Sequence, residues 1–296
     1  MNKKYKAIFF DWDGTAVMSR RAPVEEAVGA MKPLLEKGID LAIISGTTYE
    51  NIAGGAIERF FTPEELEHLY LGLGRGAYNY TFRKGKPFVF AHCIPEKEIL
   101  EKIHRICFEI HMELKNRFDF NTDIVFSRPN YCKIDLMVDN NRGDNLFMQE
   151  NELDILKTSL KEHGIEGGLQ ALIDLSREIA AGFGMEVAPT CDAKYLEVGI
   201  SSKSNNVDTI FKVLQEENPG LTAQDCVFWG DEYVGIEKGI FGSDSFMYTE
   251  LTKDADFFDV SNVNWERPAG VITLGGGIQT FLGFLREQIR ESKSNF

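Results

Sequence analysis

Two carboxylates directly follow the first apolar run of the chain. Residues 6–10 (KAIFF) lead into residues 11–15 (DWDGT), which contain Asp11 and Asp13. A carboxylate at the tip of a buried strand is held in one direction and can act as a nucleophile. A second carboxylate two residues later can protonate a leaving oxygen and then take a proton from water. The alternative interpretation is a plain Asp-Gly turn without chemistry.

A cation is implied by the closeness of these two acids. Asp11 and Asp13 would repel each other in one crevice unless a positive charge lay between them. Magnesium prefers oxygen ligands, so the pair predicts Mg²⁺ as a cofactor.

Two more apolar runs end in polar residues. Residues 41–44 (LAII) are followed by Ser45, and residues 226–229 (CVFW) lead to Asp231. Ligands bind outside the carboxyl ends of parallel strands, so we expect Ser45 and Asp231 to lie beside Asp11. Ser45 and the backbone amides after it would then donate to an anion, and Ser45 also fits the role of a helix cap.

The segment DWDGT resembles the first motif, DxDGT, of the haloacid dehalogenase superfamily. That resemblance implies that Asp11 accepts the phosphoryl group and that Asp13 is the general acid and base. Residues 43–47 (IISGT) are similar to the second motif, in which Ser45 and Gly46 would bind the phosphoryl oxygens.

Two later segments continue the resemblance in the same order. Lys203, in residues 198–205 (VGISSKSN), matches the third motif, whose lysine neutralises the transferring phosphoryl group. Without this context, the alternative interpretation of Lys203 is an ordinary surface lysine. Residues 229–232 (WGDE) are similar to the fourth motif, which supplies acidic magnesium ligands. The implied ligands are Asp11, Asp13 through its backbone carbonyl, Asp231 and Asp244, with Glu232 as the alternative to Asp244 and a solvated acidic loop as the alternative to both.

The pattern of apolar residues predicts an α/β fold with a Rossmann-like parallel core. Strands are expected at residues 6–10, 41–44, 195–198 and 226–229. The segments between them carry apolar residues at three- and four-residue spacing, which is typical of helices. Residues 69–82 are expected to form further strand, broken by glycines.

The pattern of apolar residues changes between residues 93 and 194, and this change predicts an inserted α+β cap. A long amphipathic helix is expected at residues 99–114, followed by strands at 124–126 and 131–138 and by helices at 153–160 and 169–179. The core is accordingly assigned to residues 1–92 and 195–296. An insertion at this point is similar to the cap of the branch that contains sugar phosphatases, phosphomannomutases and trehalose-phosphate phosphatases.

The cap strand at 131–138 alternates between an apolar and a polar face. Arg128 and Lys133 are candidates for holding a second anionic group of the substrate, Asn130 is a candidate for a sugar hydroxyl, and Asp135 is a weaker candidate. The alternative is a solvated sheet face with a Lys-Asp pair. Glu197, on the strand before Lys203, is expected to brace that lysine.

Three glycine-rich or histidine features are set aside. Residues 71–76 (LGLGRG) lack the spacing of a dinucleotide fingerprint. The glycines at 275–277 are interpreted as a flexible helix entry, and His104 and His111 lie too far apart on one helix for a metal pair.

The composition limits the partners. A net charge of −14 disfavours nucleic acid, and we expect no membrane span. The five cysteines form no CxxC pair, so we expect reduced thiols and a cytoplasmic protein. No heptad pattern indicates an oligomer.

The favoured function is a magnesium-dependent phosphatase for a small phosphorylated metabolite, above all a sugar phosphate. A phosphomutase and a silent phosphate-binding module are the alternatives.

Overall fold

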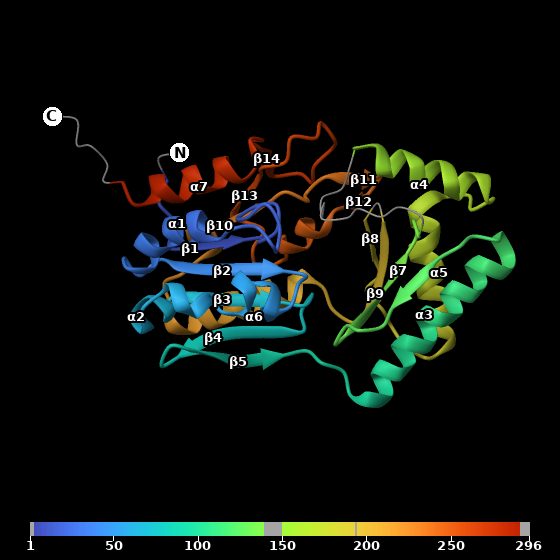
Figure 1. Cartoon of the computed structure of the whole chain (residues 1–296), viewed down its shortest axis with the longest axis horizontal. Coiled ribbons are helices and arrows are strands. Elements are labelled where there is room, and N and C mark those ends of the chain that lie inside the picture. Colours follow the sequence, from blue (N-terminus) through green and yellow to red (C-terminus); the bar gives the residue numbers. More distant parts are fainter. Residues whose placement is uncertain (1–2, 139–149, 193, 291–296) are drawn as a thin grey trace.

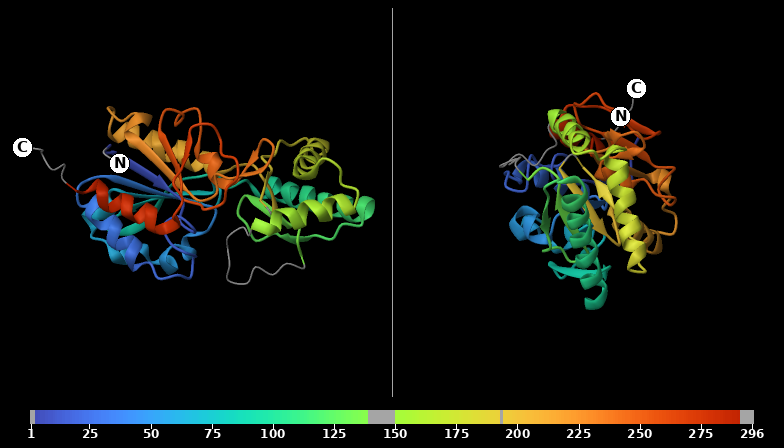
Figure 2. Two further views of the ribbon diagram at one scale, coloured as in Figure 1. Left: turned by 90° about the horizontal axis from the view of Figure 1, so that it is seen from above. Right: turned by 90° about the vertical axis from the view of Figure 1, so that its right-hand side faces the viewer.

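The computed structural model describes residues 3–138, 150–192 and 194–290. Its elements form two lobes along the long axis of the molecule (Figures 1 and 2). One lobe holds a large sheet built from both ends of the chain, and the other holds a smaller sheet built from its middle.

The large sheet has eight strands in the order β14-β13-β10-β1-β2-β3-β4-β5. Neighbouring strands from β14 to β3 are parallel, while β4 and β5 add an antiparallel edge. The bounds are β1 Ala7–Phe10, β2 Asp40–Ser45, β3 Leu69–Leu73, β4 Tyr78–Arg83, β5 Lys86–His92, β10 Cys226–Gly230, β13 Asp256–Asp259 and β14 Val271–Thr273.

Helices cover both faces of this sheet, which explains why its central strands are apolar throughout. The helices α1 (Glu25–Leu35), α2 (Pro63–Leu66) and α7 (Gly277–Gln288) pack with Ile8 and Phe10 on one face. On the other face α6 (Lys203–Glu217) packs with Ala7 and Phe9. This architecture matches the α/β core expected from the sequence.

The smaller sheet has the order β6-β7-β9-β8 and is antiparallel. Its strands are β6 Asp123–Val125, β7 Tyr131–Asp135, β8 Thr190–Cys191 and β9 Tyr195–Gly199. The helices α3 (Lys97–Phe118), α4 (Glu150–Glu162) and α5 (Gly168–Gly182) supply the apolar side chains that cover one face of it. Burial alternates from Cys132 to Asp135, but Tyr131, which the predicted alternation places on the polar face, is almost fully buried.

The assignment of residues 195–198 to the parallel core was wrong. This segment is β9, which pairs antiparallel with β7 and β8 in the smaller sheet. A short apolar run fits a buried strand of either kind, so the sequence pattern does not distinguish them. The division into a core and a cap stays a prediction, and the strand pairing favours placing its second junction after Gly199.

Short elements complete the fold. The strands β11 (Gly235–Glu237) and β12 (Ile240–Phe241) form a hairpin whose Ile236 and Ile240 pack into the apolar cluster of the smaller sheet. The 3₁₀ helices are η1 Tyr49–Asn51, η2 Ala53–Gly55, η3 Ile57–Phe60, η4 Ala223–Asp225 and η5 Ser243–Met247. Among the described residues, no helix combines the length and apolar character that a membrane span requires.

Three aromatic rings stack across the centre of the large sheet. The ring of Phe228 lies 4.6 Å from that of Phe9 and 4.8 Å from that of Phe257, between their centroids. We expect Phe228→Ala to lower the free energy of unfolding by about 3–5 kcal/mol, because it leaves a cavity in a fully packed region. Urea denaturation measures this loss. The control Phe108→Ala, at a half-exposed site on α3, should change stability by under about 1 kcal/mol.

Candidate active site

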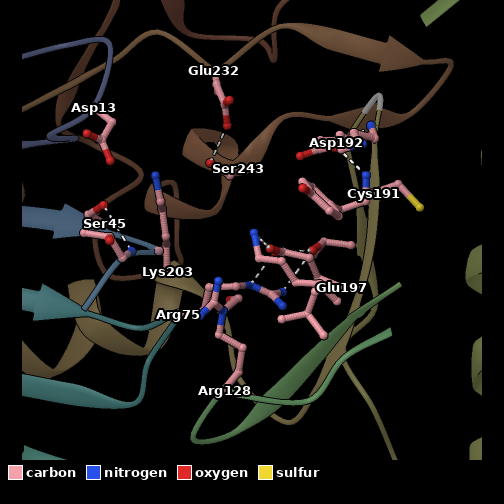
Figure 3. A pocket seen from close by; sticks show the side chains of 18 of the residues that line it. Asp13, Ser45, Arg75, Arg128, Cys191, Asp192, Glu197, Lys203, Glu232 and Ser243 are labelled. Atoms are coloured by element: carbon pink, nitrogen blue, oxygen red, sulfur yellow. Dashed lines mark hydrogen bonds and ion pairs between the residues drawn. The ribbon is translucent and has the colours of Figure 1, made fainter. Parts of the chain in front are cut away.

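A cavity of about 680 Å³ opens where the carboxyl ends of the parallel strands meet the smaller sheet (Figure 3). Residues of both lobes line it, so candidates predicted from distant segments of the sequence do converge. Those lining it are Asp11, Asp13, Ser45, Gly46, Lys203, Glu232, Arg128, Lys133 and Asp135. Asp231, Asp244 and Asn130 lie outside this lining.

Lys203 joins three segments of the core. It begins α6, and its Nζ lies 2.7 Å from Oδ1 of Asp11 and 2.7 Å from Oδ1 of Asp244. All three side chains are at least nine-tenths buried. A buried cation is stable only when it is paired, so this contact restricts where the tips of β1 and α6 can lie. Ser202 and Asn205 form a capping box that starts α6 at this position.

Asp244 holds the loop after β10 in place. Its Oδ2 accepts hydrogen bonds from the backbone N–H of Asp231 (3.0 Å) and of Glu232 (2.8 Å). The long interval between Asp231 and Asp244 contains the β11–β12 hairpin, which leaves the core to pack in the cap and then returns. The other candidate, Glu232, accepts a hydrogen bond from the Ser243 hydroxyl.

Asp231 packs directly against the first motif. The Thr15 hydroxyl donates to its Oδ1 at 2.9 Å. A Cβ on Gly14 would come within 2.2 Å of Oδ2 of Asp231, and the φ of Gly14 is +96°. Glycine is therefore required at position 14 on two grounds, its conformation and the closeness of the carboxylate.

Negative charge is in excess at this end of the cavity. Burial raises the pKa of Asp11 despite the nearby Lys203, and burial together with Asp244 and Asp11 raises the pKa of Asp231. Oδ1 of Asp13 is buried without a hydrogen-bond partner, while its Oδ2 lies 3.5 Å from the Arg20 guanidinium. A hard cation bound by oxygen would offset this charge, so the donor set fits magnesium.

The carboxylates alone do not form a ready-made metal cage. Within residues 3–138, 150–192 and 194–290, no group of three His, Cys, Asp or Glu side chains is placed to hold a metal ion. The expected set needs fewer side chains, because one of its ligands is the backbone carbonyl of Asp13. Asp244 already uses both oxygens on protein donors, which makes a positioning role more suitable for it.

Ser45 ends β2 next to these acids. It is almost fully buried, and its Oγ accepts a hydrogen bond from the Thr47 N–H at 3.3 Å. The chain at Gly46 and Thr47 continues along the cavity wall. The second motif is thus placed where its polar groups reach the same space as Asp11 and Lys203.

The candidate substrate-binding residues near the smaller sheet make different contacts. Asn130 is fully buried and donates to the carbonyl of Arg75 (3.1 Å) and to the Ser201 hydroxyl (2.6 Å), so its amide supports the core–cap junction instead of facing a sugar. Lys133 faces the cavity but pairs with Glu197 at 2.7 Å. Asp135 pairs with Lys194 at 2.9 Å.

Arg75 is the residue that the sequence reasoning missed. It lies in the loop between β3 and β4, and its Nε contacts Glu197 at 3.0 Å while Nη2 donates to Thr190 at 2.9 Å. Its guanidinium carbon lies 4.8 Å from the centroid of the Tyr131 ring. A side chain from the loop between two strands of the large sheet is therefore inserted among the strands of the smaller sheet. The sequence does hold one sign of a special role for Arg75: it is an arginine between two glycines, within residues 71–76.

The loop around Arg75 is unusual in its backbone. Gly74, Arg75 and Gly76 have φ values of +67°, +54° and +93°. A non-glycine residue in the left-handed region costs about 1 kcal/mol or more and persists where surrounding contacts hold it. Here the Arg75 carbonyl accepts from Asn130 and Ser201, and the Gly76 N–H donates to Asn206 at 2.6 Å.

Glu197 was expected to brace Lys203, and that expectation was wrong. Its carboxylate instead takes Lys133 on Oε1 and Arg75 on Oε2. Burial alone would raise the pKa of Glu197, but the charges of Lys133 and Arg75 outweigh burial and lower this pKa to about 2. Glu197 is therefore the common anion of a second buried ion cluster, on the cap side of the cavity.

The sequence is similar to one curated protein described as a phosphatase. A "putative phosphatase" of Mycoplasma genitalium is 27% identical over 251 residues, which are 78% of this chain and 83% of that protein. No family model matches the chain.

The solved structures that resemble this fold include phosphatases. The IMP-nucleotidase of Plasmodium falciparum matches with a TM-score of 0.59 at 12% identity, covering 99% of this chain and 64% of the nucleotidase, so the chain spans slightly less than two thirds of its length. An ATP-bound structure of the same nucleotidase gives a TM-score of 0.62 at 12% identity, covering 100% of this chain and 62% of that one. The trehalose-6-phosphate phosphatase of Aspergillus fumigatus gives 0.54 at 14% identity, with 97% and 94% covered.

These likenesses confirm the expected fold class, an α/β core with a mostly parallel sheet. The similar proteins are phosphatases, in agreement with the phosphoric monoester hydrolase that the four motifs predict.

Replacing Arg75 should loosen the junction between the two sheets. We expect Arg75→Met to lower the free energy of unfolding by about 1–3 kcal/mol, because hydrogen bonds to a buried carboxylate are lost while Lys133 still neutralises it. Urea denaturation measures the loss, and hydrogen exchange should accelerate at the amides of residues 199–202. Arg105→Met, at an exposed position on α3, is the matched control. Unchanged exchange at residues 199–202 would contradict the inserted role of Arg75.

The ion cluster should also make stability depend on pH. Because the pKa of Glu197 is about 2 in the folded chain and about 4.3 when unfolded, its contribution is complete above pH 4.3 and disappears as the pH falls towards 2. The unfolding free energies of wild type and Glu197→Gln should converge by on the order of 3 kcal/mol between pH 5 and pH 2. Denaturant titrations across this range measure both proteins, and parallel profiles would refute the assignment.

Proposed function

We propose that this chain is a magnesium-dependent phosphatase that hydrolyses a small phosphorylated metabolite through an aspartyl-phosphate. The observation that carries the proposal is the 2.7 Å contact between Lys203 and Asp11, inside a cavity that Asp13 and Ser45 also line. A nucleophile, a second acid and a positive charge at one point are the parts that phosphoryl transfer needs.

The reaction proceeds in two displacements. Asp11 attacks phosphorus and forms a new P–O bond, while the ester P–O bond breaks and Asp13 gives its proton to the departing alkoxide. Asp13 then takes a proton from water, whose oxygen attacks phosphorus, and the aspartyl P–O bond breaks to restore Asp11 and release phosphate. Lys203, Ser45 and the amide after it stabilise the charge on the phosphoryl oxygens.

Magnesium would be held by Asp11, Asp231 and the backbone carbonyl of Asp13, and it would supply positive charge to offset the phosphate and the surrounding acids. Asp244 then orients Lys203 and the loop that carries Asp231. The buried carboxylates that crowd around Asp11 and Asp231 support this assignment, because a cation would offset their charge.

The size of the cavity supports a small substrate. About 680 Å³ is within the range of ordinary metabolite sites, roughly 300–1,000 Å³. We propose a sugar phosphate as the substrate class and a cytoplasmic location, where the five free cysteines would remain reduced.

Substitution of the nucleophile tests the proposal. We expect Asp11→Asn to lower kcat for an aryl phosphate by at least about 10³-fold, because an amide cannot form the phosphoryl-enzyme. Phosphate release with and without Mg²⁺ measures activity, and acid-quenched protein analysed by mass spectrometry detects the aspartyl-phosphate. Asp154→Asn, an exposed acid on α4, is the matched control and should retain full activity.

The outcomes separate the alternatives. Full activity in Asp11→Asn, or in wild type treated with a chelator, would refute the mechanism. Isomerised sugar phosphate without release of phosphate would identify a phosphomutase. A folded protein without turnover on a panel of phosphorylated metabolites would refute the enzyme assignment.

A further inference from the structure

The cap end of the cavity carries more positive than negative charge around Glu197. Arg75 and Lys133 share this single carboxylate, as described above. Arg128, from the loop between β6 and β7, lines the same cavity, and in Figure 3 its side chain projects towards Arg75. Three cations thus surround one anion.

Arg128 is the cation of this group that makes no direct contact with Glu197, although its charge helps to lower the pKa of that carboxyl. Its guanidinium donates a hydrogen bond of 3.5 Å to the neighbouring Ser127 carbonyl, and within the described residues no carboxylate forms an ion pair with it. The other acids of the cap wall are engaged elsewhere: Asp135 pairs with Lys194, and Asp192 accepts from the backbone N–H groups of residues 194 and 195. Figure 3 shows Asp192 beside Cys191, on the far side of Glu197 from Arg128.

The excess of positive charge around Glu197 contrasts with the negative charge of the rest of the molecule. The chain has a net charge of −14, and the opposite end of the cavity is crowded with acids. A partly buried guanidinium loses hydration that a paired anion would replace, so a cation directed into a cavity marks the place of a negatively charged ligand group. Arg75 and Lys133 hold the direct contacts with Glu197, and the charge of Arg128 acts on this carboxylate as a weaker, more distant contribution.

We propose that Arg128, with Lys133 beside it and Arg75 as a positioning residue, binds a second anionic group of the substrate, either a carboxylate or a second phosphate. This proposal rests on the proposed phosphatase function and narrows its substrate class. The substrate is a phosphate monoester whose second acidic group lies at the end of the cavity remote from Asp11. Sugar bisphosphates and phosphorylated sugar acids have this chemistry.

Matched substrates test the proposal by kinetics. Wild type should hydrolyse glucose 1,6-bisphosphate or 6-phosphogluconate with a kcat/KM at least about 10-fold above that for glucose 6-phosphate, since a charge-assisted contact contributes about 1.5–3 kcal/mol. Arg128→Ala should lower kcat/KM for the two-anion substrates by about 10–100-fold and for glucose 6-phosphate by less than about threefold. Arg128→Lys should restore part of the loss, and the exposed control Arg105→Ala should change neither.

Binding without turnover separates this inference from the proposed function. Calorimetry should show tighter binding of propane-1,3-bisphosphonate or 3-phosphonopropionate than of propylphosphonate, and Arg128→Ala should remove the difference. The first two probes distinguish a second phosphate from a carboxylate. If the chain hydrolyses nothing yet binds these probes through Arg128, the function fails and the anion site stands. If the chain is active but Arg128→Ala affects one-anion and two-anion substrates equally, or if IMP is preferred to both two-anion sugars, the inference is overturned.

Discussion

The structure depends on one buried ammonium group among carboxylates. Lys203 lies between Asp11 and Asp244, which come from opposite ends of the chain, and it brings the tips of β1 and α6 and the start of η5 together. Taking these charges out of water is costly, so the arrangement is stable only with all three partners in place. The same contact that fixes the fold at this point also places a positive charge where a phosphoryl group would be attacked.

A second buried ion cluster holds separate segments together at the smaller sheet. Glu197 lies between Arg75 of the core and Lys133 of the cap, and the unusual backbone of the loop at Arg75 is held by hydrogen bonds from Asn130 and Ser201. The two clusters face each other across one cavity. The two clusters differ in charge: carboxylates are in excess at the strand tips, and cations are in excess around Glu197.

The long loop after β10 shows how the two lobes share one site. The chain leaves Asp231, adds the β11–β12 hairpin to the apolar cluster of the cap, and returns to place Asp244 beneath the backbone amides that follow β10. An insertion of this length would disturb a metal site if it were loose. Ile236 and Ile240 of the hairpin are buried in the apolar cluster of the smaller sheet. The loop is therefore anchored, and it connects the two lobes a second time.

The sequence alone determined the core of the site, since Asp11, Asp13 and Ser45 follow buried strands whose carboxyl ends meet by the geometry of a parallel sheet. Lys203 is predicted by its motif, although the strand before it, β9, pairs in the smaller sheet and not in the parallel one. Only the tertiary structure decided the partner of Glu197, the burial of Asn130 and the role of Arg75. These depend on which side chains meet between segments far apart in the chain, and local apolar patterns carry no information about such pairing.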